Sequence, residues 1–172
     1  MNTLKLGLVV LGLTATSALA DGSWNTLQTV ETINVNASPD ATYAVVSKWD
    51  ALESWCPAFA STVIESGGNE VGSVRAITLK DGPTFTEELL ASDPAGRSYR
   101  YKIIDSPLPI VEYVSTVRVI GSGNKSSIIW VASYKRRAAD NPTAESDDQA
   151  MLNLVGGLYK ACLGNAKKVA EQ

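Results

Sequence analysis

The apolar residues in the last stretch of the chain, residues 145–171, recur at steps of three and four, which places them on one side of a long helix. Asp147 and Asp148 stand near its start and Lys167 and Lys168 near its end, an arrangement that suits the helix dipole. A helix of about 25 residues, at ~1.5 Å per residue, needs a broad partner for its apolar side. The residues on that side are Met151, Leu154, Val155, Leu158, Cys162, Ala166 and Val169.

Seven segments before this helix have the alternating or turn-bounded pattern of β-strands. In the first, residues 28–36, alternate residues such as Ile33 and Val35 share one side of the strand. Short turns between the later strands, such as Asp81-Gly82, make neighbouring strands antiparallel. The other predicted strands are residues 59–66, 71–80, 84–92, 98–104, 111–120 and 126–136.

Two short helices are predicted between the first and second strands. Ser38 as N-cap and Pro39 at the first helical position begin a helix that continues over residues 41–48. Asp50 is expected to cap a second helix over residues 51–55. The predicted order of elements is therefore β-α-α-β6-α, an α+β fold.

Gly156 and Gly157 stand in the middle of the long helix. Each glycine costs roughly 1 kcal/mol relative to alanine in a helix, and either close packing on the sheet or the missing side-chain volume would compensate for that cost. Seven twisted strands curl into an incomplete barrel, and the helix covers its open side. The pattern thus predicts an apolar cavity between sheet and helix.

Residues 1–20 have the pattern of a signal peptide. Lys5 is followed by an apolar run, residues 6–13, that is too short to span a bilayer, and residues 18–20 form a small-x-small cleavage site. The alternative is an uncleaved membrane anchor. The interpretation as a signal peptide predicts an exported protein, periplasmic or secreted, whose mature chain, residues 21–172, is a single domain.

Composition excludes several classes of function. The chain has 15 basic and 18 acidic residues and no long basic run, so neither nucleic acid nor an anionic membrane is an expected partner. No second apolar stretch is long enough for membrane insertion of the mature chain. The absence of histidine excludes Ser-His-Asp and Cys-His chemistry, and two cysteines are too few for a thiolate zinc site. No metal and no cofactor is expected.

Several short motifs occur in an order that is similar to the SRPBCC superfamily. They are Ser38-Pro39-Asp40 with Trp49, Trp55-Cys56-Pro57, residues 71–75, residues 86–89, residues 99–104, residues 107–109 with Tyr113, and Trp130. The superfamily includes START domains, the birch-pollen-allergen fold, plant abscisic-acid receptors and polyketide cyclase/dehydrase proteins. The resemblance covers residues 28–171 and implies a helix-grip fold, in which a seven-stranded antiparallel sheet wraps around a long C-terminal helix.

The resemblance also implies which side chains face a hydrophobic pocket. Matched to the abscisic-acid receptors, Glu87 is an inward carboxylate on the fourth strand. Cys56 falls where those receptors carry a ligand-anchoring lysine, which speaks against an anionic, hormone-like acid as the ligand. The implied pocket residues are Glu87, Tyr101, Ile103, Tyr113, Ser115, Leu154, Leu158 and Cys162.

Two interpretations of the polar pocket residues stay open. Glu87 is either a ligand-orienting or acid-base carboxylate, or a carboxylate at the rim that pairs with Arg75 or Arg100. Tyr101 and Tyr113 are either hydrogen-bond donors to a ligand or packing residues with hydroxyls at a wet end.

The matched positions of Cys56 and Cys162 lie near one end of the implied pocket, which together with the export signal suggests a disulfide. The alternative is two buried thiols.

The sequence is compatible with three functions. The first is an exported binding protein for an apolar small molecule, such as a lipid, an isoprenoid or an aromatic metabolite. The second is a polyketide cyclase/dehydratase-type enzyme, in which Glu87 with Tyr101 or Tyr113 transfers protons. The third is an interaction protein whose own side chains fill the cavity. The absence of histidine and of cofactor motifs favours the first.

Overall fold

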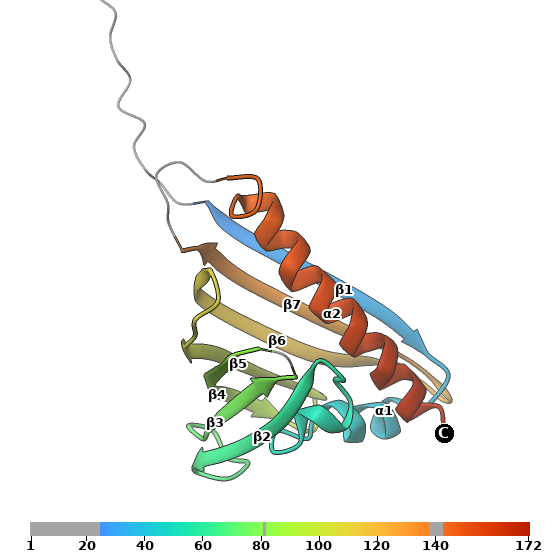
Figure 1. The fold of residues 1–172 in the computed structure, drawn as a ribbon. Coiled ribbons are helices and arrows are strands. Elements are labelled where there is room, and N and C mark those ends of the chain that lie inside the picture. The colour runs from blue at the N-terminus through green and yellow to red at the C-terminus, as the bar shows by residue number, and fades with distance from the viewer. Residues whose placement is uncertain (1–24, 81, 138–142) are drawn as a thin grey trace, which may run out of the picture.

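A computed structural model describes residues 25–80, 82–137 and 143–172. Within these ranges the elements follow the predicted order, and the signal peptide expected over residues 1–20 lies outside them (Figure 1). The elements are β1 (Thr26–Val35), α1 (Pro39–Val46), the short 3-10 helix η1 (Leu52–Ser54), β2 (Phe59–Ser66), β3 (Val74–Leu79), β4 (Thr84–Asp93), β5 (Ser98–Asp105), β6 (Ile110–Ser122), β7 (Lys125–Arg136) and α2 (Asp148–Ala170).

The seven strands of the described ranges form one antiparallel sheet in the order β1-β7-β6-β5-β4-β3-β2. The register places Arg75 on β3 opposite Glu87 on β4, and Tyr101 on β5 opposite Ser115 on β6. Paired residues of neighbouring strands share a face of the sheet, and all four of these side chains are buried on the inner face. The predicted seven-stranded antiparallel sheet is confirmed.

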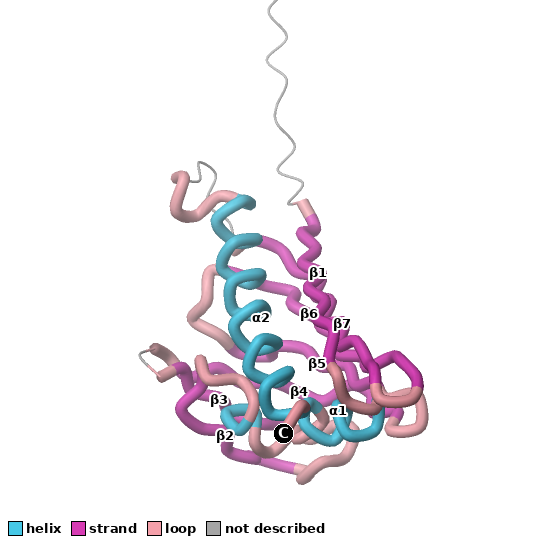
Figure 2. The backbone as a smooth tube through the Cα atoms, turned by 90° about the vertical axis from the view of Figure 1, so that its right-hand side faces the viewer, coloured by secondary structure: helices cyan, strands magenta, loops and turns pink. Residues whose placement is uncertain are grey.

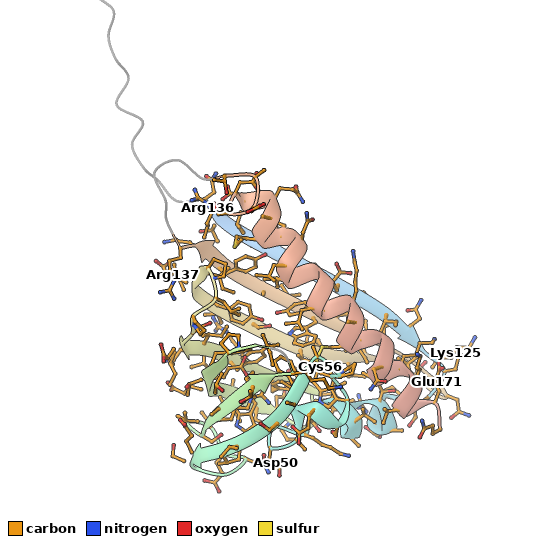
Figure 3. All side chains as sticks on the ribbon, viewed as in Figure 1. Asp50, Cys56, Lys125, Arg136, Arg137 and Glu171 are labelled. Atoms are coloured by element: carbon orange, nitrogen blue, oxygen red, sulfur yellow. A yellow bond between two sulfur atoms is a disulfide. The ribbon has the colours of Figure 1, made fainter. Side chains whose placement is uncertain are left out.

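The helix α2 lies along the inner side of the curved sheet, and its C-terminal end is beside α1 (Figures 1 and 2). Asp147 is the N-cap, and its carboxylate accepts a hydrogen bond of 2.8 Å from the backbone N–H of Ala150. Hydrogen bonds tie both ends to the sheet or its border: Arg136 of β7 donates to Asp148 over 3.1 Å, and Glu171 accepts from the N–H of Asn36, just after β1, over 2.7 Å. Figure 3 labels Arg136 and Glu171. The long predicted helix is confirmed.

The face that α2 buries differs from the predicted one. Leu154 is 44% exposed, whereas Tyr159 and Leu163 are buried. The buried stripe follows steps of four from Met151 through Val155 to Tyr159 and Leu163, with Cys162 and Ala166 beside it. The sequence prediction left out both Tyr159 and Leu163, so it placed the centre of the stripe too close to Leu154 and Leu158.

The close packing expected at the two glycines of α2 is found at only one of them. A Cβ atom at Gly156 would lie 3.4 Å from Oε1 of Glu31 on β1 and 3.9 Å from Cγ2 of Thr29. A Cβ at Gly157 would have no described neighbour within 4 Å. Gly156 therefore allows the helix to approach β1, and Gly157 faces open space.

The two short helices differ in how well the sequence predicted them. Ser38 caps α1 as expected, with its Oγ 3.2 Å from the backbone N of Ala41. The second helix is only the 3-10 turn η1, and Asp50 does not cap it. The backbone N–H of Leu52 instead donates over 3.1 Å to Thr62 of β2, so a side chain from the sheet replaces the expected local cap.

The third strand is shorter than predicted, because it begins at Val74 rather than at Val71. Gly72 has φ +89°, a left-handed conformation that glycine adopts readily and that interrupts an extended strand. The side chain of Val71 is 59% exposed. The other strand boundaries shift by at most two residues relative to the prediction.

A disulfide joins Cys56, which follows η1, to Cys162 on α2. Their Cα atoms are 4.2 Å apart, and 106 positions of sequence separate them. Figure 3 shows Cys56 beside the helix. Close to the bond, the Asn165 side chain donates to the carbonyl of Trp55 over 3.2 Å. The segment between α1 and β2 is thus attached directly to the helix.

No helix in the described ranges is both long and apolar enough to cross a bilayer.

Candidate functional site

A cavity of about 110 Å³ lies between the sheet and α2, and its wall is almost entirely apolar. Leu154, Val155 and Leu158 contribute to the wall from the helix. Of these three, Leu154 is nearly half exposed and Val155 is buried. The aromatic lining residues are Phe59, Phe85, Tyr101, Tyr113, Trp130 and Tyr159.

The structure brings six of the eight sequence-predicted pocket residues to this wall. They are Glu87, Tyr101, Ile103, Tyr113, Leu154 and Leu158. Ser115 and Cys162 are buried but are not part of the described wall. Ser115 lies behind Tyr159 and Trp130, to which its hydroxyl is hydrogen-bonded, and Cys162 is turned toward Cys56. Ligand binding by any of these residues stays a prediction.

Glu87 forms a buried ion pair with Arg75. Nε and Nη2 of the arginine donate to Oε2 of the glutamate over 2.8 and 2.6 Å, and Nη1 donates to the carbonyl of Trp49 over 2.8 Å. The guanidinium carbon also lies 3.6 Å from the ring centroid of Trp49, a cation–π contact. Both side chains are at most 4% exposed. The alternative of a rim carboxylate is therefore wrong about burial, although it named the correct partner.

Burial raises the pKa of the Glu87 carboxyl above its ordinary value, and the facing Arg75 guanidinium lowers it to a smaller extent. Both hydrogen bonds to the carboxylate end on Oε2, and Oε1 has no hydrogen-bond partner among the described residues. Glu87 lines the cavity, so it is the acidic group of the wall that a guest would meet.

Four hydroxyl groups and one indole N–H form a cluster on the inner face of the sheet. Its members are Tyr101, Tyr113, Ser115, Trp130 and Tyr159, and we call it the hydroxyl cluster. The Tyr113 hydroxyl is hydrogen-bonded to the hydroxyls of both Tyr101 (3.3 Å) and Tyr159. The indole of Trp130 stacks on the ring of Tyr159 with centroids 3.9 Å apart. The cluster thus connects β5, β6, β7 and α2, and all of its members except Ser115 line the cavity.

The phenols of the hydroxyl cluster stay neutral over a wide pH range. Burial raises the pKa of Tyr101, Tyr113 and Tyr159 well above that of an exposed tyrosine, because the ionised phenolate would lose its hydration. The negative charge of a neighbouring tyrosine, once ionised, and of Glu87 raises the pKa of each of the three phenols further. The alternative of tyrosine hydroxyls at a wet end is therefore wrong for Tyr101 and Tyr113, which are buried and bonded to each other.

Sequence reasoning missed two important residues of this site. Tyr159 was absent from the predicted helix face, although its spacing of four from Val155 and Leu163 was a usable signal. Arg75 was expected only at the rim, whereas alternation with buried Ile77 on β3 points it inward.

The described residues contain no group of three or more histidine, cysteine, aspartate or glutamate side chains arranged to hold a metal ion.

A curved antiparallel sheet that encloses an apolar cavity under a long C-terminal helix defines a helix-grip protein. The family described as polyketide cyclase/dehydrase and lipid transport matches residues 26–171. The chain therefore belongs to this family, whose fold binds hydrophobic small molecules, and the resemblance to the SRPBCC superfamily is confirmed. A search of curated protein sequences gave no significant match.

Solved structures share the same fold. XoxI from Bacillus cereus is 25% identical and has a TM-score of 0.72, with 82% of this chain and 93% of that chain covered. The Zhui aromatase/cyclase from Streptomyces sp. R1128 is 16% identical, with a TM-score of 0.75 and 86% and 94% coverage. Norcoclaurine synthase from Thalictrum flavum, solved with dopamine and hydroxybenzaldehyde, is 20% identical, with a TM-score of 0.67 and 97% and 96% coverage. The similarity to these last two shows the fold alone.

Proposed function

We propose that this protein is an exported binding protein that holds an apolar small molecule between its sheet and α2. The observation that carries the proposal is the apolar cavity itself, which the protein's own side chains leave open. Membership of a family whose fold binds hydrophobic small molecules supports it. The unoccupied space speaks against an interaction protein whose cavity is filled by its own side chains.

The size of the cavity narrows the class of guest. About 110 Å³ is of the same order as the roughly 150 Å³ engineered cavity that binds benzene. A single aromatic ring or a short aliphatic chain fits such a space without displacing protein atoms, and a long lipid tail does not. Among the guests expected from the sequence, the aromatic metabolite agrees best with the volume.

Export is part of the proposal and rests on the sequence of residues 1–20. The disulfide between Cys56 and Cys162 agrees with it, because such bonds persist in oxidising compartments outside the cytosol. N-terminal sequencing of the protein from the periplasmic or culture fraction tests this part. We expect the mature chain to begin at Asp21, and a cell-associated chain that retains Met1 would contradict export.

Two measurements test the binding function. Extraction and mass analysis of freshly purified protein identify a guest that co-purifies with it, and calorimetric titration with toluene measures the affinity of the cavity for a single apolar ring. Ile103 lines the cavity and Ile104, its neighbour on β5, is 47% exposed. We expect Ile103→Trp to fill the space and abolish toluene binding, whereas Ile104→Trp, the matched control, binds as the natural chain does. Failure of the natural chain to bind toluene would contradict the proposal.

The alternative function is a polyketide cyclase/dehydratase-type enzyme, which the family description and the presence of Glu87 and three tyrosines around one cavity favour. The ion pair with Arg75 weakens it, because Oε2 of Glu87 already accepts two hydrogen bonds from a permanent cation. Incubation with a short poly-β-ketone separates the two functions: an enzyme releases a cyclised product, and a binding protein returns the compound unchanged.

A further inference from the structure

Two members of the hydroxyl cluster have hydrogen bonds of fixed direction. The hydroxyl of Ser115 lies 2.9 Å from the carbonyl oxygen of Val131, and a carbonyl only accepts, so Ser115 donates its single hydrogen there. The indole N–H of Trp130 only donates, and its acceptors are Ser115 at 2.9 Å and Tyr101 at 3.2 Å. The bond from Ser115 to Val131 sets the direction of the bonds between the hydroxyls of the cluster.

The remaining directions follow one after another. Ser115 has no second hydrogen, so Tyr159 donates to it over 3.0 Å. Tyr159 has then used its own hydrogen, and Tyr113 donates to Tyr159. In the same way Tyr101 donates to Tyr113 over 3.3 Å. Every hydroxyl hydrogen of the cluster is therefore donated, those of the three tyrosines within the cluster and that of Ser115 to the carbonyl of Val131, and only oxygen lone pairs remain for another molecule.

Glu87, the acidic lining residue, likewise offers a guest only hydrogen-bond acceptors. Oε1 of Glu87 carries lone pairs and no hydrogen when the carboxylate is paired with Arg75. Among the described lining side chains Trp130 alone carries an N–H, and that hydrogen is already donated. While Glu87 is ionised, no described lining side chain thus keeps a hydrogen to donate to a guest.

We infer that the cavity accepts hydrogen bonds from its guest but donates none, and that it selects a one-ring aromatic molecule bearing a hydroxyl or amino hydrogen over one of similar size bearing a carbonyl. This inference rests on the proposed function and specifies its ligand class. A carbonyl guest loses its hydrogen bonds to water and finds no donor in the wall, which lowers its affinity. Polyketide-like molecules, rich in carbonyl groups, are poor guests for the same reason.

Three probes of similar size test the inference. Toluene offers neither a donor nor a strong acceptor, phenol offers a hydrogen, and benzaldehyde only accepts. We expect calorimetry to show that phenol binds about tenfold or more tightly than benzaldehyde. If none of the three binds, the proposed function fails. If toluene binds and benzaldehyde binds as tightly as phenol, the function stands and this inference is overturned.

A conservative substitution should give the cavity wall a free hydrogen-bond donor. Tyr159→Phe removes the acceptor of the Tyr113 hydrogen and frees it for a guest, so the affinity for benzaldehyde relative to phenol should rise about tenfold. Tyr134→Phe is the matched control, because Tyr134 is equally buried but bonds Thr29 at 2.7 Å and does not line the cavity. An unchanged ratio in a folded Tyr159→Phe protein would contradict the inference.

A second variant covers the case in which Tyr159→Phe does not fold. Ser115→Ala removes the acceptor of the Tyr159 hydrogen and frees it without changing a residue of the cavity wall. A merely structural role of Ser115 would weaken the binding of all three probes alike. The inference requires a change in the ratio of benzaldehyde to phenol affinity, and a uniform loss would contradict it.

Discussion

Arg75 and Glu87 lie directly opposite each other on β3 and β4, and Nη2 of the arginine is 2.6 Å from Oε2 of the glutamate. Both side chains are buried, and Trp49 contacts the guanidinium with its ring and accepts a hydrogen bond from it with its carbonyl. A buried charge without its partner is costly, because the protein interior does not replace the lost hydration. The two residues are therefore expected to depend on each other for stability.

Glu87→Gln is expected to destabilise the fold by about 3–5 kcal/mol, because it leaves the Arg75 guanidinium buried and unpaired. Urea denaturation measures the change in the free energy of unfolding. Glu88→Gln is the matched control, since Glu88 is the next residue on β4 and its pair with Lys102 is partly exposed, so we expect a loss below about 1 kcal/mol. Equal losses in the two variants would contradict the structural role given to the buried pair.

Stability should fall in alkaline solution as the pH rises above about 10, the pKa of an unfolded tyrosine. Burial raises the pKa of Tyr101, Tyr113 and Tyr159 in the folded chain, so above this pH the unfolded chain binds fewer protons than the folded chain. The free energy of unfolding then decreases with pH. Phenolate absorbance during an alkaline titration should rise together with the loss of the circular dichroism signal, and ionisation of all tyrosines before unfolding would refute this.

Removal of the disulfide is expected to destabilise the chain by ~4–5 kcal/mol, because Cys56 and Cys162 close a loop of 106 positions and restrict the unfolded state. Chemical denaturation of Cys56→Ala, Cys162→Ala and the double variant measures the loss, and the three should lose similar amounts. Intact mass before and after reduction checks the bond itself. A mass unchanged by reduction would show that the purified protein holds two thiols.

Gly157→Ala is expected to stabilise the protein by about 1 kcal/mol, because a Cβ at this helical position meets no described atom within 4 Å and alanine is the better helix former. Gly156→Ala should gain less, since its Cβ would lie 3.4 Å from the Glu31 carboxylate. Thermal unfolding followed by circular dichroism compares the two variants. A loss of stability in Gly157→Ala would indicate that the middle of α2 packs more closely than the structure shows.

The strands and the long helix were predictable because their signals are local. Alternation along β1 and the spacing of three and four along α2 depend only on which residues of one segment share a face. Ser38 capped α1 as expected for the same reason. Asp50 failed as a cap because its competitor, Thr62, is on another element and approaches Leu52 only after β2 has folded back.

The candidate site was predictable only in part. The resemblance to a known superfamily pointed to Glu87 and Tyr101, but it left the partner of the carboxylate and the role of the phenols open. The pairing with Arg75 depends on the register between β3 and β4. The contact of Tyr113 with Tyr159 depends on how α2 is rotated about its axis, and the predicted helix face, which left out Tyr159 and Leu163, placed that rotation incorrectly.

The sequence by itself determined the elements, their order and the apolar character of the surfaces that meet, because each follows from residues that are close along the chain. The tertiary structure decided which polar atoms share the cavity and in which direction their hydrogen bonds run. These depend on six elements meeting, β3 with β4 at the ion pair and β5, β6 and β7 beneath α2 at the hydroxyl cluster. Contacts between residues so far apart in sequence leave no local pattern from which they can be predicted.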